Sequence, residues 1–485
     1  MEPFTTPTSA GAAAVVLASN RGPVSYALDD AGQLVPRRGG GGLVSGLSGA
    51  ASGVWVCAAL TEGDRLASRQ AEGGRLHPAD EASPAVRMLD IDPLTFDRAY
   101  SVVANSVLWF VQHQLFDAAY LPSFDERFAR DWASYEQYNG AFADAIASTA
   151  APGAAVLVQD YHLTLVPQLL REQRPDLRIS HFSHTPWATP DYFRILPEAV
   201  ATEVLTGMLG ADRVGFLTER WADAFLRCCA ELLGVPVDGR TVSYAGRSIV
   251  VDVHPLGVDG PGLRERAARP DVQARLTTLR EQVGDRRCIV RIDRTELSKN
   301  ILRGLEAYRE LLRRYPQWVG HVVHVAFAYP SRHDLPAYRE YTAAVQRAAR
   351  AIIDEFGTAE WNPLLLHVED DYPRSLAAYQ LADVLLVNPV RDGMNLVAKE
   401  GPVLAAGGCV LVLSREAGAA AELGDDALLV NPFDIVETTD ALHTALLMSP
   451  LERRERCDRL TVAATAMPPS AWFAAQLTAL GVGST

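Results

Sequence analysis

The sequence predicts an α/β protein with two large domains, each built on a parallel sheet. Short, almost wholly apolar runs recur along the chain, for example at 13–18 and 383–387, and such runs are typical of parallel strands that are covered on both faces. Segments of helical length separate these runs, and strands that alternate with helices predict parallel pairing. The length of 485 residues is enough for two such domains.

Composition and charge exclude several classes of function. The chain has 45 Lys and Arg against 59 Asp and Glu, a formal charge of −14, which argues against a nucleic-acid or membrane-surface role. No apolar run reaches the roughly 18 residues of a transmembrane helix, and no signal-peptide pattern is present. The six cysteines form no CxxC pair, which predicts reduced thiols in a cytoplasmic protein. Because zinc and calcium ligand spacings and a P-loop are absent from the sequence, we expect no metal and no cofactor.

The first domain begins with a strand at 13–18 that ends close to Arg21. Open α/β sheets bind ligands at the carboxyl edge of their strands, so Arg21 is a candidate ligand-binding residue. Four glycines follow at 39–42, and they would let the backbone approach a phosphate or a sugar, although a flexible loop has the same composition. The polar stretch 61–90 lacks periodicity and predicts loops. The segment 100–109 predicts a helix whose aromatic residues belong to the core or to a ligand site.

Two further strands of this domain lead to polar side chains. The strand at 156–159 ends in Asp160, and the strand at 179–183 ends in His184. Because the carboxyl ends of parallel strands meet at one edge of a sheet, we expect both side chains to lie near Arg21. A single residue of this kind is usually structural, whereas three at strand ends favour a site.

The domains are expected to divide at about residue 255. Strands at 214–217 and 248–253 complete the first domain, which spans 1–255, and the second domain takes residues 256–464. The last helix, within about 465–485, is expected to pack back on the first domain. The second domain is predicted to contain strands at 288–292, 321–328, 364–368 and 383–387, and helices at 301–315 and 337–356.

Cations follow the strands of the second domain as well. Arg294 and Lys299 come after its first strand, and Arg332 comes after a later one. In a chain of formal charge −14, cations at strand ends favour the binding of phosphate groups. The alternative is that these side chains only solvate the surface.

The segment 391–400 combines several binding features. The strand at 383–387 leads into it, and a helix from about 396 to 405 leaves it. The N-terminus of that helix would offer N–H groups and a positive dipole end to a diphosphate.

Four side-chain positions in this segment have predicted tasks. Gly393 is expected to make the tight turn, and Asn395 is expected to cap the helix. Asp392 can accept hydrogen bonds from sugar hydroxyls, and Glu400 can accept them from a ribose. The alternative is a capped turn with an incidental surface aspartate.

These stretches together resemble the trehalose-6-phosphate synthase family of retaining glycosyltransferases. The likeness covers about 15–472 and rests on motifs in a fixed order. They are Ser19-Asn20-Arg21, Gly41-Gly42-Leu43, the segment 105–109, Asp160-Tyr161-His162, His184-Thr185-Pro186, Arg294 with Ser298-Lys299, Ser331-Arg332 and the segment 391–400. The resemblance implies two facing Rossmann-like domains, the GT-B arrangement, with parallel sheets and the active site in the interdomain cleft.

The resemblance also implies roles for residues at matching positions. Donor binding is implied for Gly41, Gly42, Arg294, Lys299, Asp392, Met394, Asn395, Leu396, Val397 and Glu400. Binding of glucose 6-phosphate is implied for Arg21, Tyr100, Trp109, Asp160 and Arg332. The residues expected around the reacting atoms are His184, Asp160, Arg294, Lys299 and Asp392.

The implied reaction moves glucose from a nucleotide-glucose to glucose 6-phosphate and gives α,α-trehalose 6-phosphate. The sequence offers no obvious carboxylate pair for double displacement. By resemblance, retention follows from front-side attack without a metal, and the leaving phosphate accepts the acceptor's proton. The resemblance is compatible with a homo-oligomer, and it implies a separate phosphatase that takes the product.

Three departures from the family pattern bear on the substrates. Glu296 and Asn300 replace an aspartate and a glycine, and Ala58-Ala59-Leu60 replaces a Trp-Ser-Gly near the acceptor. Near the nucleobase, Asp371 replaces an aromatic residue of uridine-using relatives. A carboxylate suits guanine, whose N1–H and N2–H2 donors lie side by side. Asp370 and Asp371 therefore predict a preference for GDP-glucose over UDP-glucose, and the alternative is a solvated acidic turn.

Two other functions fit the same motifs. One is a pseudo-glycosyltransferase that couples a nucleotide-cyclitol to an aminocyclitol phosphate, which the altered segment 58–60 keeps open. The other is a non-catalytic sugar-phosphate sensor, against which the intact donor residues argue.

Overall fold

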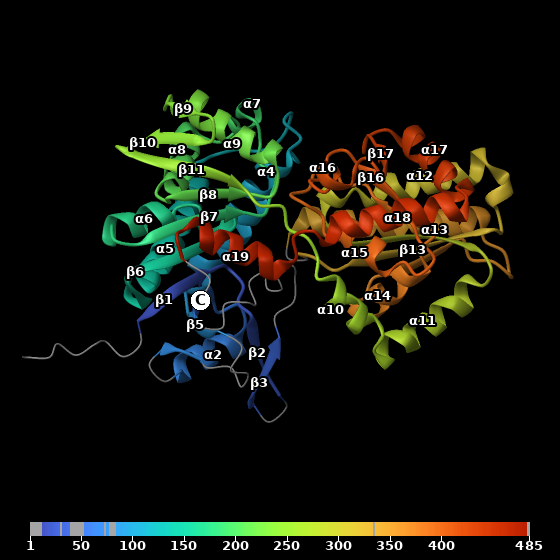
Figure 1. Cartoon of the computed structure of the whole chain (residues 1–485), viewed down its shortest axis with the longest axis horizontal. Coiled ribbons are helices and arrows are strands. Elements are labelled where there is room, and N and C mark those ends of the chain that lie inside the picture. Colours follow the sequence, from blue (N-terminus) through green and yellow to red (C-terminus); the bar gives the residue numbers. More distant parts are fainter. Residues whose placement is uncertain are drawn as a thin grey trace, which may run out of the picture. The chain divides into compact units, whose positions relative to one another are not determined.

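The computed structural model describes residues 12–29, 32–38, 53–71, 74–76, 84–332 and 335–482. It contains two units (Figure 1): unit 1 comprises Met1–Pro255 and Pro469–Thr485, and unit 2 comprises Leu256–Pro468. Each unit has its own largely parallel sheet with helices between the strands. The predicted α/β class with parallel sheets is confirmed.

Unit 1 is built on a nine-stranded sheet with the order β5-β4-β1-β6-β7-β8-β11-β10-β9. The parallel strands are β1 (Ala13–Ala18), β4 (Val54–Ala58), β5 (Ala85–Leu89), β6 (Ala150–Gln159), β7 (Arg178–Ser183), β8 (Arg213–Phe216) and β11 (Arg247–Val253). The antiparallel strands are β9 (Val237–Asp238), β10 (Thr241–Tyr244) and the hairpin pair β2 (Val24–Leu28) and β3 (Leu34–Arg38). β1 and β6 pair at the centre, with Val16 opposite Val156.

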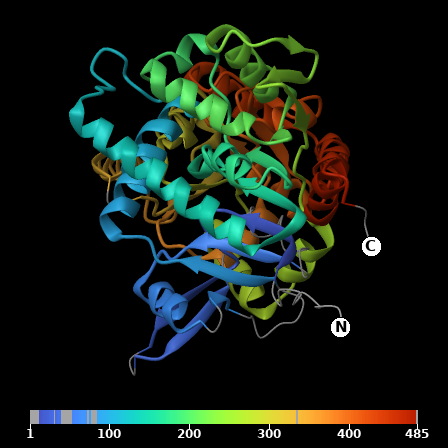
Figure 2. The ribbon, with the colours of Figure 1, turned by 90° about the vertical axis from the view of Figure 1, so that its left-hand side faces the viewer.

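Most helices of unit 1 lie between these strands in the sequence, and several bury apolar side chains. The helices are α2 (Glu62–Gln70), α3 (Pro93–Asp97), η2 (Arg98–Leu108), α4 (Trp109–His113), α5 (Glu126–Thr149), η3 (Tyr161–Leu163), α6 (Val166–Gln173), α7 (Pro190–Phe193), α8 (Glu198–Leu209), α9 (Glu219–Leu232) and α19 (Pro469–Ala479). The 24-residue helix α5 is capped by the Asp125 carboxylate and buries Tyr135, Tyr138 and Phe142. Figure 2 shows α5 lying against the strands of this sheet.

The C-terminal helix α19 packs within unit 1. Trp472 is fully buried, and its ring meets the Phe182 ring at a centroid distance of 4.9 Å. Its indole N–H donates to the His254 carbonyl at 2.9 Å. These contacts fix the last helix beside β7, whose final residues lie near the candidate site.

Unit 2 is built on a six-stranded sheet, parallel throughout, with the order β14-β13-β12-β15-β16-β17. The strands are β12 (Arg287–Arg294), β13 (Val322–Tyr329), β14 (Leu364–His367), β15 (Val384–Val387), β16 (Val410–Ser414) and β17 (Leu428–Val430). The helices are α10 (Gly260–Ala267), α11 (Pro270–Val283), η4 (Leu297–Lys299), α12 (Ile301–Arg314), η5 (Pro316–Trp318), α13 (Pro336–Phe356), α14 (Tyr372–Leu381), α15 (Val397–Leu404), α16 (Ala420–Leu423), α17 (Ile435–Leu447) and α18 (Pro450–Thr465). All eight residues of β13 are buried, which accounts for its continuous apolar sequence.

The prediction of loops over 61–90 is wrong for the described part of that stretch. Helix α2 begins there with a capping box, in which the Thr61 hydroxyl accepts from the Asp64 N–H and the Asp64 carboxylate accepts from the Thr61 N–H. Strand β5 follows and pairs with β4. The helix was missed because its polar surface masks the apolar period, whereas its cap was visible in the sequence.

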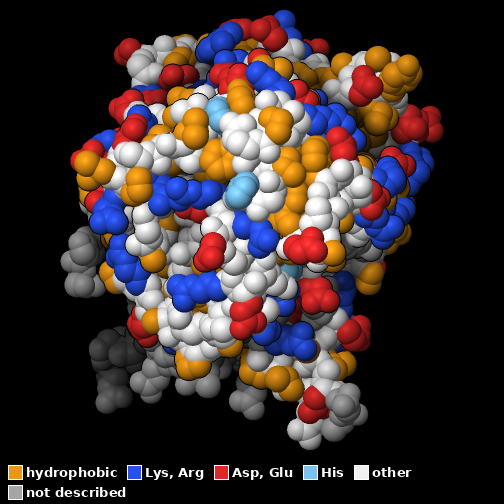
Figure 3. All heavy atoms as spheres, turned by 90° about the vertical axis from the view of Figure 1, so that its right-hand side faces the viewer, with side chains coloured by type: hydrophobic (Ala, Val, Ile, Leu, Met, Phe, Trp, Pro, Cys, Tyr) orange, Lys and Arg blue, Asp and Glu red, His pale blue; other side chains and the backbone are white. Residues whose placement is uncertain are grey.

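The six cysteines are all free and buried. Acidic and basic side chains are interspersed over the face drawn in Figure 3. Within the described ranges, none of the helices is both long and apolar enough to cross a membrane.

Candidate active site

The strand order of each sheet reverses at one point, and candidate residues follow the strands on either side of it. In unit 1 the reversal lies between β1 and β6, and in unit 2 it lies between β12 and β15. Open α/β sheets bind ligands outside the carboxyl ends of the strands at such a point. Arg21 and Asp160 follow the first pair of strands, whereas Arg294 is the last residue of β12 and Asp392 follows β15.

Unusual backbone conformations concentrate at these strand ends. Six described non-glycine residues have a positive φ, and four of them are Asp160, Asn300, Arg332 and Asn395. Asp160, at φ 73° and ψ 170°, occupies a region that is otherwise almost restricted to glycine. Such conformations cost roughly 1–3 kcal/mol each and cluster at functional sites. Their positions support a ligand site at both strand-order reversals.

Asp160 and His184 are joined directly in unit 1. The backbone N–H of His184 donates to Asp160 Oδ1 at 3.1 Å. The imidazole Nε2 of His184 lies 2.9 Å from Gln159 Oε1, and its ring packs against Phe182 and Trp472. Burial lowers the pKa of His184 to about 3, and the neighbouring His181 acts in the same direction. His184 is therefore neutral at pH 7.

Gln159 was missed by the sequence analysis. It is the last residue of β6 and is fully buried. The signal was present, because an amide at the last position of an otherwise apolar strand requires a polar partner. Its partner, His184, lies 25 positions away, so the pair itself required the fold.

The substitution Gln159→Glu tests how His184 is held neutral. A carboxylate in place of the amide would favour the imidazolium and raise the pKa of His184. We expect wild-type kcat/KM to show no His184 titration between pH 5 and about 8, while the variant gains a pH-dependent limb in this range. Identical pH profiles for the two proteins would contradict the direct contact between the His184 imidazole and the side chain at position 159.

Aromatic side chains surround Arg21 and Asp160. An Arg21 guanidinium N–H donates to the Tyr100 hydroxyl at 3.4 Å. The Tyr100 ring stacks on His162 at a centroid distance of 5.5 Å, and the Trp109 ring lies 5.6 Å from that of Tyr161. The residues predicted to bind the acceptor thus lie together in unit 1, with the exception of Arg332.

In unit 2, the predicted phosphate and sugar groups form an ion pair. Lys299 Nζ lies 2.5 Å from Asp392 Oδ2, and the Asn395 amide donates to the same oxygen at 3.0 Å. Burial would lower the pKa of Lys299, but the carboxylates of Asp392, Glu296 and Asp293 outweigh it and raise the pKa above its ordinary value. Lys299 is therefore charged throughout the physiological range.

Glu296 lies among these cations and was not recognised as a site residue in the sequence. It is fully buried, accepts from the Ser331 hydroxyl at 3.0 Å and lies 3.3 Å from the Arg294 guanidinium. Burial raises the pKa of Glu296, but Arg294, Arg332 and Lys299 together lower it more strongly, to about 2. The Arg294 side chain remains 58% exposed, so one carboxylate anchors a cation that still faces solvent.

Arg332 has a second partner within unit 2. Its guanidinium donates to the Tyr338 hydroxyl at 2.6 Å and lies over the Tyr338 ring. Together with Glu296, Tyr338 holds this cation beside the end of β13.

In the turn before α15, the residue with an unusual backbone conformation is Asn395 and not Gly393. The prediction placed the special backbone at Gly393, whereas the left-handed conformation belongs to Asn395, at φ 76°. The N-cap position belongs to Leu396 rather than to Asn395 as predicted, although Asn395 Oδ1 still accepts from the Ala398 N–H at 3.3 Å. The turn is packed so closely that a Cβ at Gly418 would lie 1.9 Å from the Gly393 carbonyl oxygen.

Helix α15 begins at Val397, directly after Met394, Asn395 and Leu396. Met394 is buried, and its carbonyl accepts from the Ala419 N–H at 2.8 Å. The first N–H groups of a helix lack intrahelical acceptors, so this terminus suits an anion.

Glu400, three residues into α15, is half-buried. The Tyr379 hydroxyl donates to Glu400 Oε2 at 3.0 Å. Burial raises the pKa of Glu400 to about 7, although the bond from Tyr379 opposes this shift. A half-buried carboxyl group with a raised pKa is a candidate site group.

The two acidic residues near β14 have different surroundings. Asp371 caps α14 by accepting from the Arg374 N–H at 3.0 Å, and its other oxygen lies 2.9 Å from Arg275 Nε. Asp370 is exposed. Asp371 therefore has a structural task that accounts for it, whereas Asp370 remains available to a ligand. Gly41 and Gly42, predicted to approach the donor, lie outside the described residues.

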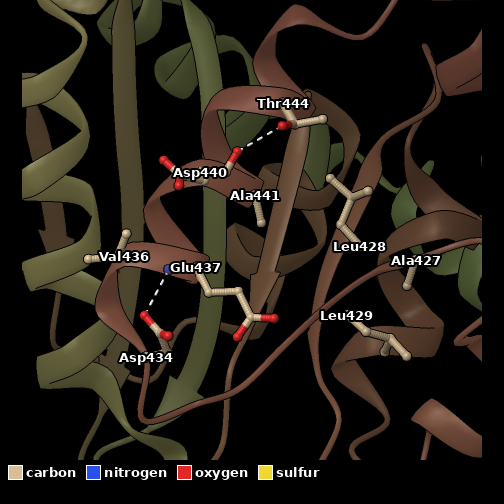
Figure 4. A pocket seen from close by; sticks show the side chains of 9 residues that line it. All are labelled: Ala427, Leu428, Leu429, Asp434, Val436, Glu437, Asp440, Ala441 and Thr444. Carbon is tan, nitrogen blue, oxygen red and sulfur yellow. Dashed lines mark hydrogen bonds between the residues drawn. The ribbon is translucent and has the colours of Figure 1, made fainter.

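A pocket of about 580 Å³ lies in unit 2, away from the candidate residues. It is lined by Ala427, Leu428, Leu429, Asp434, Val436, Glu437, Asp440, Ala441 and Thr444 (Figure 4). Two of its acids have partners within unit 2, since the Asp434 carboxylate accepts from the Glu437 N–H and the Asp440 carboxylate accepts from the Tyr315 hydroxyl. The described polar groups of the site thus do not line this pocket.

Comparison with known proteins assigns the chain to a family. The model of "Glycosyltransferase family 20" matches residues 14–481. The chain is 33% identical over 469 residues to α,α-trehalose-phosphate synthase [UDP-forming] 2 of Aspergillus niger, covering 93% of this chain and 94% of the relative. It is 32% identical over 464 residues, 94% of this chain, to synthase A of Dictyostelium discoideum, of whose length it spans 61%.

Two solved structures are similar over nearly the whole chain. One is described as trehalose-6-phosphate from E. coli bound with UDP-2-fluoro glucose, with a TM-score of 0.85 and 28% identity, covering 97% of this chain and 99% of that chain. The other is the UDP-forming synthase from Burkholderia xenovorans in complex with glucose-6-phosphate, with a TM-score of 0.84 and 26% identity, covering 96% and 99%. The protein is therefore a glycosyltransferase and belongs to glycosyltransferase family 20.

Proposed function

We propose that this protein is an α,α-trehalose-phosphate synthase that moves glucose from a nucleotide-glucose to the anomeric hydroxyl of glucose 6-phosphate. The observation that carries the proposal is the pairing of Lys299 with Asp392 at the N-terminus of α15, at a strand-order reversal. Lys299 can bind a phosphate, and Asp392 can bind sugar hydroxyls. A nucleotide-sugar carries both groups next to each other. Relatives named as synthases support the choice of reaction.

The donor would occupy the unit 2 site. Arg294 and Lys299 would receive the diphosphate together with the N–H groups at the start of α15, from Met394 to Val397. Asp392 would exchange its bond with Lys299 for hydroxyls of the glucose. Glu400 would receive the ribose hydroxyls through the oxygen that Tyr379 leaves available.

Glucosyl transfer breaks the bond between the anomeric carbon and a diphosphate oxygen. Positive charge then develops on that carbon and negative charge on the departing diphosphate, which Arg294, Lys299 and the helix N-terminus stabilise. The acceptor hydroxyl attacks from the same face and forms the new C–O bond, and its proton passes to the leaving phosphate oxygen. The cations of the chain supply the charge, so the proposal requires no metal.

The acceptor would use groups of unit 1. Arg21, Tyr100, Trp109 and Asp160 offer one cation, two aromatic surfaces and one carboxylate, which suit a sugar phosphate. The glucose-6-phosphate complex of the Burkholderia relative supports this acceptor. Arg332 is proposed as a second phosphate ligand, and neutral His184 as a hydrogen-bonding partner of the transferred glucose.

The nucleobase preference is a separate part of the proposal. The named relatives are UDP-forming, whereas a carboxylate near the base would favour guanine, and Asp370 is the acid that remains available. We expect Asp370→Asn to lower the ratio of kcat/KM for GDP-glucose to that for UDP-glucose by about tenfold, because a guanine-specific hydrogen bond to a charged group contributes about 1.5–3 kcal/mol.

The matched control for this prediction is Asp371→Ala, which removes a helix cap and an ion pair next to the same turn. It should lower the Tm without changing the donor ratio. A wild-type enzyme that clearly prefers UDP-glucose, with a ratio that Asp370→Asn does not change, would overturn the guanine hypothesis.

Product formation tests the proposed function. The purified chain is incubated with UDP-glucose or GDP-glucose and glucose 6-phosphate, and products are examined by mass spectrometry. A disaccharide phosphate with release of the matching nucleoside diphosphate is expected. Donor binding without any disaccharide phosphate would reject the synthase, and acceptor screening with aminocyclitol phosphates would then separate a pseudo-glycosyltransferase from a sensor.

A further inference from the structure

The segment before the acceptor aromatics forms an unusual helix. From Arg98 to Leu108 the chain is π-helical over 11 residues. The Trp109 N–H donates to the Ala104 carbonyl, and the Ser106 hydroxyl donates to the Ser101 carbonyl at 2.8 Å, each reaching back five residues. Such helices are rare, usually last one turn and are frequent at functional sites. A π-helix of this length therefore calls for a physical reason.

The π-helix changes which side chains share a face. With hydrogen bonds between residues five apart, a turn takes more than four residues, so positions separated by five and by nine lie on one side. In an α-helix, nine residues make about two and a half turns, which would place Trp109 opposite Tyr100. Asn105 and Trp109 follow Tyr100 by five and by nine positions, so all three side chains lie on one side of the π-helix.

These three side chains do meet one target. Tyr100 stacks on His162 with an interplanar angle of 15°, and Trp109 lies against the ring of Tyr161. Between them, Asn105 Oδ1 accepts from the Tyr161 hydroxyl at 2.7 Å. The target is the turn η3, which directly follows Asp160.

The turn is also held from its other side. The Tyr135 hydroxyl of α5 donates to the Tyr161 carbonyl at 2.7 Å, and the Asn139 amide donates to the His162 carbonyl at 3.3 Å. Asn105 is 1% exposed and Tyr161 is 4% exposed. Their hydrogen bond is therefore shielded from water, and it fixes the rotation of the π-helix relative to Asp160.

We propose that the π-helix places Tyr100 and Trp109 on one face around the Asp160 turn, and that Asn105 and Tyr161 are positioning residues that lock this arrangement for a hexose phosphate. The inference rests on the proposed function, because it assigns the acceptor to Tyr100, Trp109 and Asp160. It explains how the side chains around the acceptor are held in position. Asn105 and Tyr161 fulfil this role without touching the substrate.

A double-mutant cycle tests the lock. Tyr161→Phe or Asn105→Leu leaves one buried polar group unpaired, so each should lower the Tm and raise the Kd for glucose 6-phosphate about tenfold. The double variant removes both polar groups, and stability should largely return. A positioning role predicts that the Kd for glucose 6-phosphate stays high in the double variant, whereas the Kd for the nucleoside diphosphate is unchanged throughout.

Calorimetry measures both dissociation constants without turnover. The matched control is Tyr308→Phe in unit 2, whose buried hydroxyl donates to the Pro363 carbonyl at 2.8 Å. It should lower the Tm similarly and leave both constants unchanged. Recovery of acceptor affinity together with Tm in the double variant would overturn the proposal, because the pair would then be only structural.

A second variant tests the helix itself. Insertion of an alanine after Val102 places Tyr100 and Trp109 ten positions apart, which turns Tyr100 away from Trp109 by roughly a quarter of a turn in a π-helix. We expect a more than tenfold weaker binding of glucose 6-phosphate with normal binding of the nucleoside diphosphate. Normal acceptor binding by this variant would contradict the role of the π-helix. If the wild-type chain bound only the nucleotide and formed no product, the proposed function itself would fail.

Discussion

Replacing Lys299 by methionine lowers kcat/KM for the nucleotide-glucose by about 10²–10³-fold, the loss typical of removing one group that stabilises developing negative charge. The Lys299 side chain is 16% exposed, and its ammonium lies 2.5 Å from the Asp392 carboxylate, five residues before α15 begins. Methionine preserves the length of the side chain but cannot neutralise the departing diphosphate. Steady-state kinetics with varied donor and saturating glucose 6-phosphate measure this effect.

A matched variant separates this loss from a loss of stability. Lys399→Met breaks another lysine–carboxylate pair of unit 2, because Lys399 Nζ lies 2.5 Å from Glu422 and donates to the Leu256 carbonyl at 2.8 Å. Lys399 is fully buried, so its replacement should lower the Tm at least as much as Lys299→Met does. Its effect on kcat/KM should be at least about tenfold smaller. Activity losses that merely follow the Tm in both variants would contradict the assigned role of Lys299.

Replacing Glu296 by glutamine weakens both donor binding and stability. The substitution keeps the shape of the side chain but removes the charge that holds Arg294 and lies near Arg332. We expect the KM for the donor to rise about tenfold, the effect of losing a hydrogen bond to a charged group. At pH 7 the free energy of unfolding should fall by about 3 kcal/mol, which is what a carboxyl pKa of about 2 implies for the folded state.

The pH dependence of this stability difference has a defined sign. The pKa of Glu296 is lower in the folded protein than in the unfolded chain, so its contribution is fully present above about pH 4.5 and is lost as the pH falls toward 2. Denaturation of wild-type and Glu296→Gln proteins should give a constant difference between pH 5 and about 8, and a smaller one below pH 4. A difference that is absent at pH 7 would show that Glu296 is not an anchored carboxylate.

The fold class and most strands were predictable because nearly all residues of each strand are buried. β12, β13 and β15 are buried along nearly their whole length, and burial on both faces of a parallel sheet selects a continuous apolar run. The polar groups at their ends were predictable for the same reason, since they interrupt an apolar pattern where a parallel sheet exposes its edge. Arg21, Asp160 and Asp392 were found in this way.

The partners of the site residues were not predictable, because they depend on contacts between distant positions. Lys299 and Asp392 are 93 positions apart, and Tyr379 reaches Glu400 from a different helix. The role of Glu296 depends on cations that only the fold brings together.

One local signal was present and was misread. Asp371 precedes a helix with Pro373 in its first turn, which is the pattern of a cap. The spacing of Tyr100, Asn105 and Trp109 matches no α-helical face, and only the observed backbone explains it.

The configuration of the product tests the central claim most directly. The chain is given a nucleotide-glucose and glucose 6-phosphate labelled with ¹³C at its anomeric carbon, and the product is examined by NMR. The account predicts a 1,1-linked disaccharide phosphate in which both anomeric carbons are α and the label lies in the phosphorylated ring. A β-configured product, a bond to another hydroxyl, or free glucose released from the donor in place of a disaccharide would contradict it.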